Sequence, residues 1–150
     1  MGIEIKRDRK IRTLGLSQEN YLRKLIHRFG MAKSKAVSTP FAQHFKLLAS
    51  QSPLNEDNKA EMRNVPYSSA TGSLIYNMVC TRLDLAHVMS VVSRFMANLG
   101  KAHWGMVKWV FKYLRGSLGT GLVYGGAGKE IEAKILGYSD ADYAADMDRR

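Results

Sequence analysis

Hydrophobic residues recur along this chain with two different periods, and the first change of period comes near residue 17. Alternating apolar and polar positions over residues 3–16, interrupted by the polar run Arg7-Asp8-Arg9-Lys10, predict a β-hairpin. The spacing then becomes helical, with Ser17 as an expected N-cap and Gly30 as an expected stop. The apolar stripe of this first helix consists of Tyr21, Leu22, Leu25, Ile26 and Phe29.

The middle of the chain predicts a connector followed by three helices. Residues 33–64 have few periodic apolar positions, which is typical of a connector with short local structure. Helical spacing returns over residues 67–81, again over 84–99, and finally over 101–116, KAHWGMVKWVFKYLRG. The helix expected at 84–99 has its apolar positions at Leu85, Val88, Met89, Val92, Phe95, Met96 and Leu99, and the last helix at Trp104, Val107, Val110, Phe111 and Leu114.

Beyond Gly116 the period changes back to two. The stretch GLVYGGAGKEIEAKILGYSDADYA predicts a strand, a glycine turn and a longer strand. Alternation along the longer strand puts Asp140 and Asp142 on the same side of it. These carboxylates belong either to a solvated turn or to a cation site whose other ligands lie elsewhere.

Charge adds a second pattern to the hydrophobic one. The chain has 150 residues and a formal net charge of +10, and the excess is uneven: +5 over residues 1–30, +4 over residues 101–128 and −2 over residues 129–150. A basic excess of this kind is found on ordinary soluble surfaces as well as on surfaces that bind polyanions. The arrangement of the cations is therefore more informative than their number.

Cations gather on one side of the first and last predicted helices. In the first helix, Lys24 and Arg28 are four residues apart and Arg23 lies beside them. In the last helix, spacings of seven, four and three place Lys101, Lys108, Lys112 and Arg115 on one face. That face is either solvated or directed at phosphates, and the second interpretation is supported by flanking aromatic residues and by the absence of acids from residues 101–128.

The number of cysteines and the hydropathy of the chain indicate the cellular compartment in which the protein is expected. Cys80 is the only cysteine, which excludes an internal disulfide framework and fits a reducing environment. No apolar run reaches the roughly 18 residues of a membrane span, and MGIEIKRDRK lacks a signal-peptide core. We expect an intracellular protein, cytoplasmic or nuclear, that is not secreted and does not enter a membrane.

Taken in order, these segments resemble the C-terminal half of the Pol polyprotein of copia-type (Ty1/copia) LTR retrotransposons. GIEIKRDRKIRTLGLSQENYLRKLIHRFGM is similar to the end of the reverse transcriptase, with a primer-grip-like hairpin and the first thumb helix. VPYSSATGSLIYNMVCTRLDLAHVMSVVSRFM and HWGMVKWVFKYLRGSLGTGLVYG are similar to the connecting region that follows. LGYSDADYAADMDRR resembles the opening strand of the ribonuclease H domain.

This resemblance implies an α+β fold in four parts. Residues 1–32 would be the end of the reverse transcriptase, residues 33–64 a connector, residues 65–118 a helical connection region, and residues 119–150 the first strands of a truncated ribonuclease H domain. The expected architecture is an N-terminal β-hairpin and thumb-like helix, a helical middle, and a C-terminal hairpin that starts a ribonuclease H-like sheet. The upstream polymerase segments and the rest of the ribonuclease H domain would lie outside the chain.

The resemblance also implies an activity for the parent protein: RNA-directed DNA synthesis, and hydrolysis of the RNA strand in RNA–DNA hybrids. Asp140 would be the catalytic aspartate that first binds the metal, with Asp142 as a second candidate metal ligand. Hydrolysis by Mg²⁺ or Mn²⁺ requires such hard oxygen ligands. The chain alone is expected to be inactive and to bind no cation tightly, because the remaining ligands would lie elsewhere.

The expected partner is an RNA–DNA hybrid or template–primer duplex, held through backbone phosphates. Two other interpretations stay open: a non-catalytic basic module that binds nucleic acid, and a degenerate retroelement remnant without a selected role. The residues expected to contact phosphates are Arg23, Lys24, Arg28, Lys101, Lys108, Lys112 and Arg115.

Overall fold

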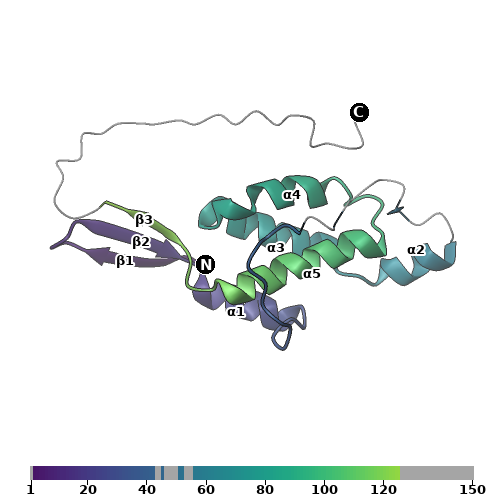
Figure 1. The fold of residues 1–150 in the computed structure, drawn as a ribbon, viewed down its shortest axis with the longest axis horizontal. Coiled ribbons are helices and arrows are strands. Elements are labelled where there is room, and N and C mark those ends of the chain that lie inside the picture. The colour runs from purple at the N-terminus through teal and green to yellow at the C-terminus, as the bar shows by residue number, and fades with distance from the viewer. Residues whose placement is uncertain (1, 43–44, 46–50, 53–55, 126–150) are drawn as a thin grey trace.

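The structure is a computed structural model that describes residues 2–42, 45, 51–52 and 56–125. These residues form five α-helices and a three-stranded antiparallel sheet, which extends from one end of the helical body (Figure 1). The fold is therefore mixed α and β, as the two hydrophobic periods predict.

The predicted N-terminal hairpin is confirmed. Strands β1 (Glu4–Asp8) and β2 (Thr13–Ser17) pair antiparallel along their whole length. The Asp8 side chain holds the turn between them, because its Oδ1 accepts the backbone N–H groups of Lys10 at 2.8 Å and Ile11 at 3.3 Å.

Helix α1 (Glu19–Arg28) follows β2 and buries Leu22, Leu25 and Ile26. The expected stop at Gly30 is confirmed, since its φ of 69° lies in the left-handed region that glycine adopts readily. The expected N-cap at Ser17 is wrong.

Ser17 is the last residue of β2 and is paired with Glu4, so the helix begins later, with Gln18 in the N-cap position and no side-chain cap there. A carboxylate from the neighbouring strand supports the first turn instead: Glu4 Oε1 accepts the backbone N–H of Asn20 at 2.8 Å.

The middle of the chain contains two further helices. Helix α2 (Glu56–Arg63) lies in the stretch expected to be a connector, and α3 (Tyr67–Cys80) matches the helix predicted for residues 67–81. Ala70 and Leu74 of α3 are fully buried. The buried Tyr67 hydroxyl donates a hydrogen bond to the backbone carbonyl of Val92 at 2.7 Å, which ties α3 to the helix that follows.

The single helix predicted over residues 84–99 is wrong in its length. The chain forms a 3-10 turn, η2 (Leu83–Leu85), and then α4 (Ala86–Ser93). Near the end of α4, the Ser90 and Ser93 hydroxyls donate to backbone carbonyls three residues earlier, a local bond that competes with regular helix geometry. Phe95 then stacks on His103 with 3.9 Å between ring centroids.

Helix α5 (Lys101–Gly116) has the predicted bounds. Its start is held by a side chain from its own first turn, because His103 Nδ1 accepts the backbone N–H of Gly100 at 2.8 Å. Trp104 is half-buried rather than buried. The residues that α5 buries in the core are His103, Met106, Val107, Val110, Phe111 and Leu114.

Strand β3 (Leu122–Tyr124) joins the N-terminal sheet in the order β1-β2-β3, pairing antiparallel with β2 so that Leu122 lies opposite Leu16. The close approach requires Gly121, since a Cβ at that position would lie 2.2 Å from the Leu16 carbonyl oxygen. Residues 122–124 thus share a sheet with the start of the chain. The longer strand predicted after them lies outside the described residues.

Candidate nucleic-acid interface

The two cation-bearing helices pack against each other. Phe29, just after α1, stacks on Phe111 of α5 with ring centroids 5.0 Å apart, and both helices bury their apolar stripes in one core. In Figure 1, α1 runs beside α5. The cations predicted to contact phosphates therefore project from two neighbouring helices.

The cations of α1 differ in how they are engaged. Arg23 forms an exposed ion pair with Glu19, one turn earlier, at 2.5 Å. Arg28 donates to the Ser69 hydroxyl at 3.2 Å, and its guanidinium carbon lies 5.4 Å from the Phe29 ring centroid. Part of the Arg23 charge is therefore neutralised locally, whereas Arg28 has contacts but no acidic partner in the described part of the chain.

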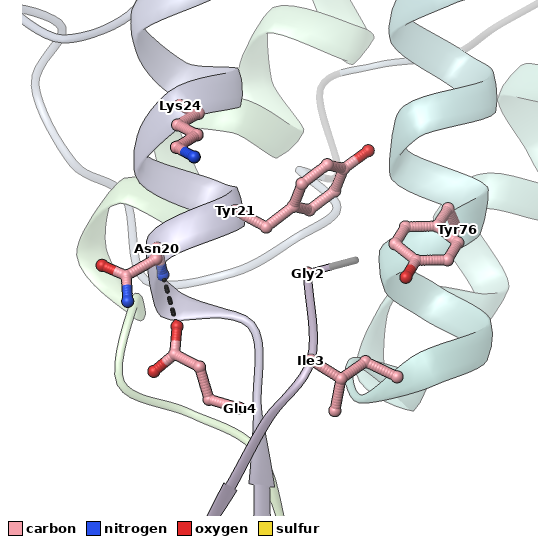
Figure 2. A pocket seen from close by; sticks show the side chains of 7 residues that line it. All are labelled: Gly2, Ile3, Glu4, Asn20, Tyr21, Lys24 and Tyr76. Carbon is pink, nitrogen blue, oxygen red and sulfur yellow. Dashed lines mark hydrogen bonds between the residues drawn. The ribbon is translucent and has the colours of Figure 1, made fainter.

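Lys24 lies at the edge of a pocket of about 440 Å³ between β1, α1 and α3 (Figure 2). Tyr21 and Tyr76 line it in edge-to-face contact, with 5.3 Å between their ring centroids, and Gly2 lies against the Tyr21 side chain. The pocket also includes the Glu4 carboxylate. Because Lys24 and Glu4 both contribute charge, this pocket does not select for anions, and the Lys24 ammonium remains exposed at its rim.

The four cations of α5 are also in different environments. Lys101 forms an exposed ion pair with Glu61 at 2.8 Å, and the Lys112 ammonium lies 5.9 Å from the Trp109 ring centroid. Lys108 is exposed and has no ion pair with any described residue. Within this row, Lys108 is the cation most available to a phosphate.

Part of the connector crosses the same side of α5. The Trp109 indole Nε1–H donates to the Thr39 carbonyl at 2.9 Å, and Arg115 donates to the Ser34 carbonyl. The Val37 N–H donates to the Lys112 carbonyl at 3.4 Å. Arg115 and Trp109 therefore fix the connector on the helix, a role that the spacing of cations did not indicate.

A buried arginine network, missed by sequence reasoning, joins the end of α5 to η2. The Arg82 side chain is 0% exposed and forms two hydrogen bonds with the Asp84 carboxylate, at 3.0 and 2.8 Å. Arg82 also donates to the backbone carbonyl and the hydroxyl of Ser117, at 2.9 and 2.8 Å. Tyr113 donates its hydroxyl to Asp84 at 2.7 Å.

Opposing effects set the protonation of this network. Burial tends to raise the pKa of Asp84, but the hydrogen bonds from Arg82 and Tyr113 and the charge of Arg82 outweigh burial and hold the pKa below its usual value. Burial, and then the hydrogen bond to Asp84, raise the pKa of Tyr113. At neutral pH Asp84 is ionised and Tyr113 is protonated. The Asp84 carboxylate therefore accepts hydrogen bonds from both Arg82 and Tyr113 and balances the positive charge of Arg82.

The predicted metal ligands, Asp140 and Asp142, lie outside the described residues. Within the part of the chain that is described, no three His, Cys, Asp or Glu side chains lie close enough to hold a metal ion. The helices found among the same residues are all too short or too polar to cross a bilayer.

Comparison with known proteins gives matches over the whole chain. The chain is 49% identical to the retrovirus-related Pol polyprotein from transposon TNT 1-94 of Nicotiana tabacum, over 100% of this chain and 11% of that protein. It is 34% identical to the Pol polyprotein from transposon RE2 of Arabidopsis thaliana, over 99% of this chain and 9% of that protein.

A third match is to a protein of another kind, the secreted RxLR effector protein 161 of Plasmopara viticola, at 45% identity over 59% of this chain and 61% of that protein. The chain thus spans about a tenth of each Pol polyprotein but more than half of the effector. No family model and no solved structure matches the chain.

Proposed function

The chain belongs to the copia-type retrotransposon Pol polyproteins, which it matches along its whole length, and we propose that it joins the reverse transcriptase of such a polyprotein to the ribonuclease H domain. In this proposal residues 1–32 end the reverse transcriptase, residues 33–118 form the connector and connection region, and residues 119–150 begin the ribonuclease H domain. The parent activity is then RNA-directed DNA synthesis with hydrolysis of the RNA strand in RNA–DNA hybrids.

Within that parent, we assign α1 and α5 the role of holding the hybrid by its phosphates. The observation that carries this assignment is the packing of α1 on α5, which puts two helices with exposed cations side by side. Phosphate contacts of this kind position a duplex without reading its sequence, and they release counterions when they form. The most available charges are those of Lys24 and Lys108.

The experiment measures affinity for an RNA–DNA hybrid as a function of salt. If about four to six phosphates are neutralised, the logarithm of the association constant should fall against the logarithm of salt concentration with a slope of about −3 to −5. Changing Lys24 and Lys108 together to Ala should flatten that slope by about 2. Neither side chain has an ion pair with a described residue, so the change should leave the fold intact.

A matched control removes the same charge elsewhere. Lys6 lies on β1 and Lys33 in the turn after α1, and both are exposed. Changing these two to Ala should lower hybrid affinity less than the change at Lys24 and Lys108. Equal effects from both pairs would mean that only net charge matters, and absence of binding at low salt would refute the proposed role altogether.

The proposed cleavage chemistry belongs to the longer protein. Asp140, with Asp142 as a candidate, would supply carboxylate oxygens to Mg²⁺ or Mn²⁺, and further ligands from other segments would complete the site. We expect the 150-residue chain to leave hybrids uncleaved in either metal. In a longer Pol protein with an intact ribonuclease H region, Asp140→Asn should abolish cleavage and preserve hybrid binding, whereas Asp148→Asn should preserve both.

The match to the Plasmopara effector supports a second candidate, a non-catalytic module that acts outside a polyprotein, for which we propose nucleic acid as the ligand. A related stretch makes up 61% of that protein, so it occurs outside a polyprotein. A module of this kind should bind hybrid as tightly alone as within a longer Pol chain. Markedly tighter binding by the longer chain, with the same Lys24 and Lys108 dependence, would favour the Pol role instead.

A further inference from the structure

The tip of the β1–β2 hairpin forms a basic groove far along the sheet from the helical body. The groove has a volume of about 700 Å³, and three arginines line it together with Asp8, Leu14 and Tyr124. These arginines are Arg7, Arg9 and Arg12.

The arginine charges in the groove are not neutralised. All three side chains are exposed, and none has an ion pair within the described residues. The single acid, Asp8, is engaged by the turn itself, because its Oδ1 accepts the N–H groups of Lys10 and Ile11. The groove therefore offers several free guanidinium groups, which bind phosphate oxygens in a forked geometry.

An aromatic ring lies beside these cations. Strand pairing places Leu14 opposite Arg7 on one side and opposite Tyr124 on the other, so the three side chains project from the same face of the sheet. Tyr124 is 53% exposed. A base has a π-face that stacks on such a ring, but a base within a duplex is already stacked on its neighbours.

We propose that this groove binds single-stranded nucleic acid, with backbone phosphates at Arg7, Arg9 and Arg12 and one base stacked on Tyr124. Cations that follow the backbone, combined with an exposed aromatic side chain, are the features by which single strands are held without sequence preference. The site is separate from the α1–α5 surface and does not depend on the proposed contact with a hybrid duplex.

The stacking contact is tested with a fluorescently labelled oligothymidylate of about 12 nucleotides, within the usual range of site sizes. Tyr124→Leu should weaken binding about five-fold or more, because the base loses its aromatic platform. Tyr124→Phe keeps the ring and should bind like the unchanged protein. Equal binding by the Leu and Phe variants would overturn the assignment of Tyr124.

The phosphate contact is tested at Arg12, where folding and binding can be separated. Arg12 has a φ of 54°, a left-handed conformation that glycine adopts without steric cost. Arg12→Gly should therefore leave resistance to urea unfolding unchanged or higher, while flattening the salt dependence of oligothymidylate binding by about one unit. Lys6→Ala removes the same charge from the opposite face of β1 and should change that slope less.

Two competitors define the ligand. A DNA duplex of equal length should displace the oligothymidylate poorly, and inorganic phosphate should displace it only at far higher concentration. Efficient displacement by either, or equal effects of Arg12→Gly and Lys6→Ala, would overturn the proposal. Because Lys24 and Lys108 lie outside the groove, their change to Ala should leave oligothymidylate affinity nearly intact, so this proposal and the one for hybrid binding can fail independently.

Discussion

The helical body and the three-stranded sheet place the same kinds of residue in opposite environments. Phe111 and Leu114 of α5 are fully buried, whereas Ile5 and Val123, on opposite faces of the sheet, are 68% and 73% exposed. In the body, the apolar side chains of neighbouring helices pack against one another. Over Ile5 and Val123 of the sheet, the described residues place no second layer (Figure 1). Hydrophobic side chains therefore stabilise the body far more than the sheet.

Arginine shows the same contrast. Arg82 in the body is completely buried and satisfied by Asp84 and Ser117. Arg7 and Arg9 on the hairpin are exposed and have no acidic partner among the described residues. The body uses a guanidinium group to join its helices, while the sheet leaves the same group available to a ligand.

The largest expected difference between the two regions is in the cost of removing a hydrophobic side chain. Phe111→Ala should lower the free energy of unfolding by about 3–5 kcal/mol, because it leaves a cavity beneath the stacked Phe29 ring. Val123→Ala should change it by less than about 0.5 kcal/mol. Urea unfolding of the two variants measures both values, and comparable losses would mean that the sheet is buried in solution.

The next largest effect concerns the buried arginine. Arg82→Met should lower the free energy of unfolding by about 2 kcal/mol, since the Ser117 carbonyl loses its donor and Asp84 keeps only the hydrogen bond from Tyr113. The control is Arg23→Met, which breaks an exposed pair with Glu19 and should cost about 0.5 kcal/mol or less. If the two substitutions cost the same, Arg82 does not hold the body together.

Acidic pH should bring the stabilities of these two variants closer together. The pKa of Asp84 lies below its usual value, so the stability that its charge contributes is present above the ordinary carboxyl pKa and is lost as pH falls through the lowered value. Stability measured by urea unfolding should fall less steeply with acid in Arg82→Met than in Arg23→Met. Parallel acid profiles would contradict this assignment.

The smallest expected effect comes from one buried hydroxyl. Tyr67→Phe removes the hydrogen bond to the Val92 carbonyl and should cost about 1 kcal/mol, whereas Tyr124→Phe, on the exposed edge of the sheet, should cost almost nothing.

Alkaline pH tests the same tyrosine. Burial raises the pKa of Tyr67 from 10.0 to about 12, so its contribution to stability is present below the ordinary value and is lost as pH rises through that interval. Tyr67→Phe should lose less stability over the interval than the unchanged protein. An identical alkaline loss would show that Tyr67 is not the titrating group.

Several elements of the fold could be predicted from local sequence alone. The 3.6-residue spacing around Val107, Val110 and Leu114 fixes both the helix and the side that it buries, because every turn repeats the same apolar stripe. Gly30 ends α1 because a left-handed residue stops a helix wherever it occurs. The cation rows of α1 and α5 follow from the same spacing.

Contacts between distant segments could not be predicted in this way. The helical period continues past Ser93 to Leu99, but Phe95 turns away to stack on His103. The sequence around Arg82 gives no sign that this side chain is buried, and only the approach of Ser117 and Tyr113 encloses it.

The sequence by itself determined the type of most elements and the apolar sides of α1 and α5, because each depends on residue types at short spacing. The relationship to Pol polyproteins also follows from the sequence, through identity along the whole chain. The tertiary structure decided which cations remain available and which strand lies beside which. Leu16 and Leu122 pair across the sheet although more than a hundred residues separate them. The pairing of β2 with β3 depends on how the helical body brings the two ends of this segment together, and a local sequence pattern does not contain that information.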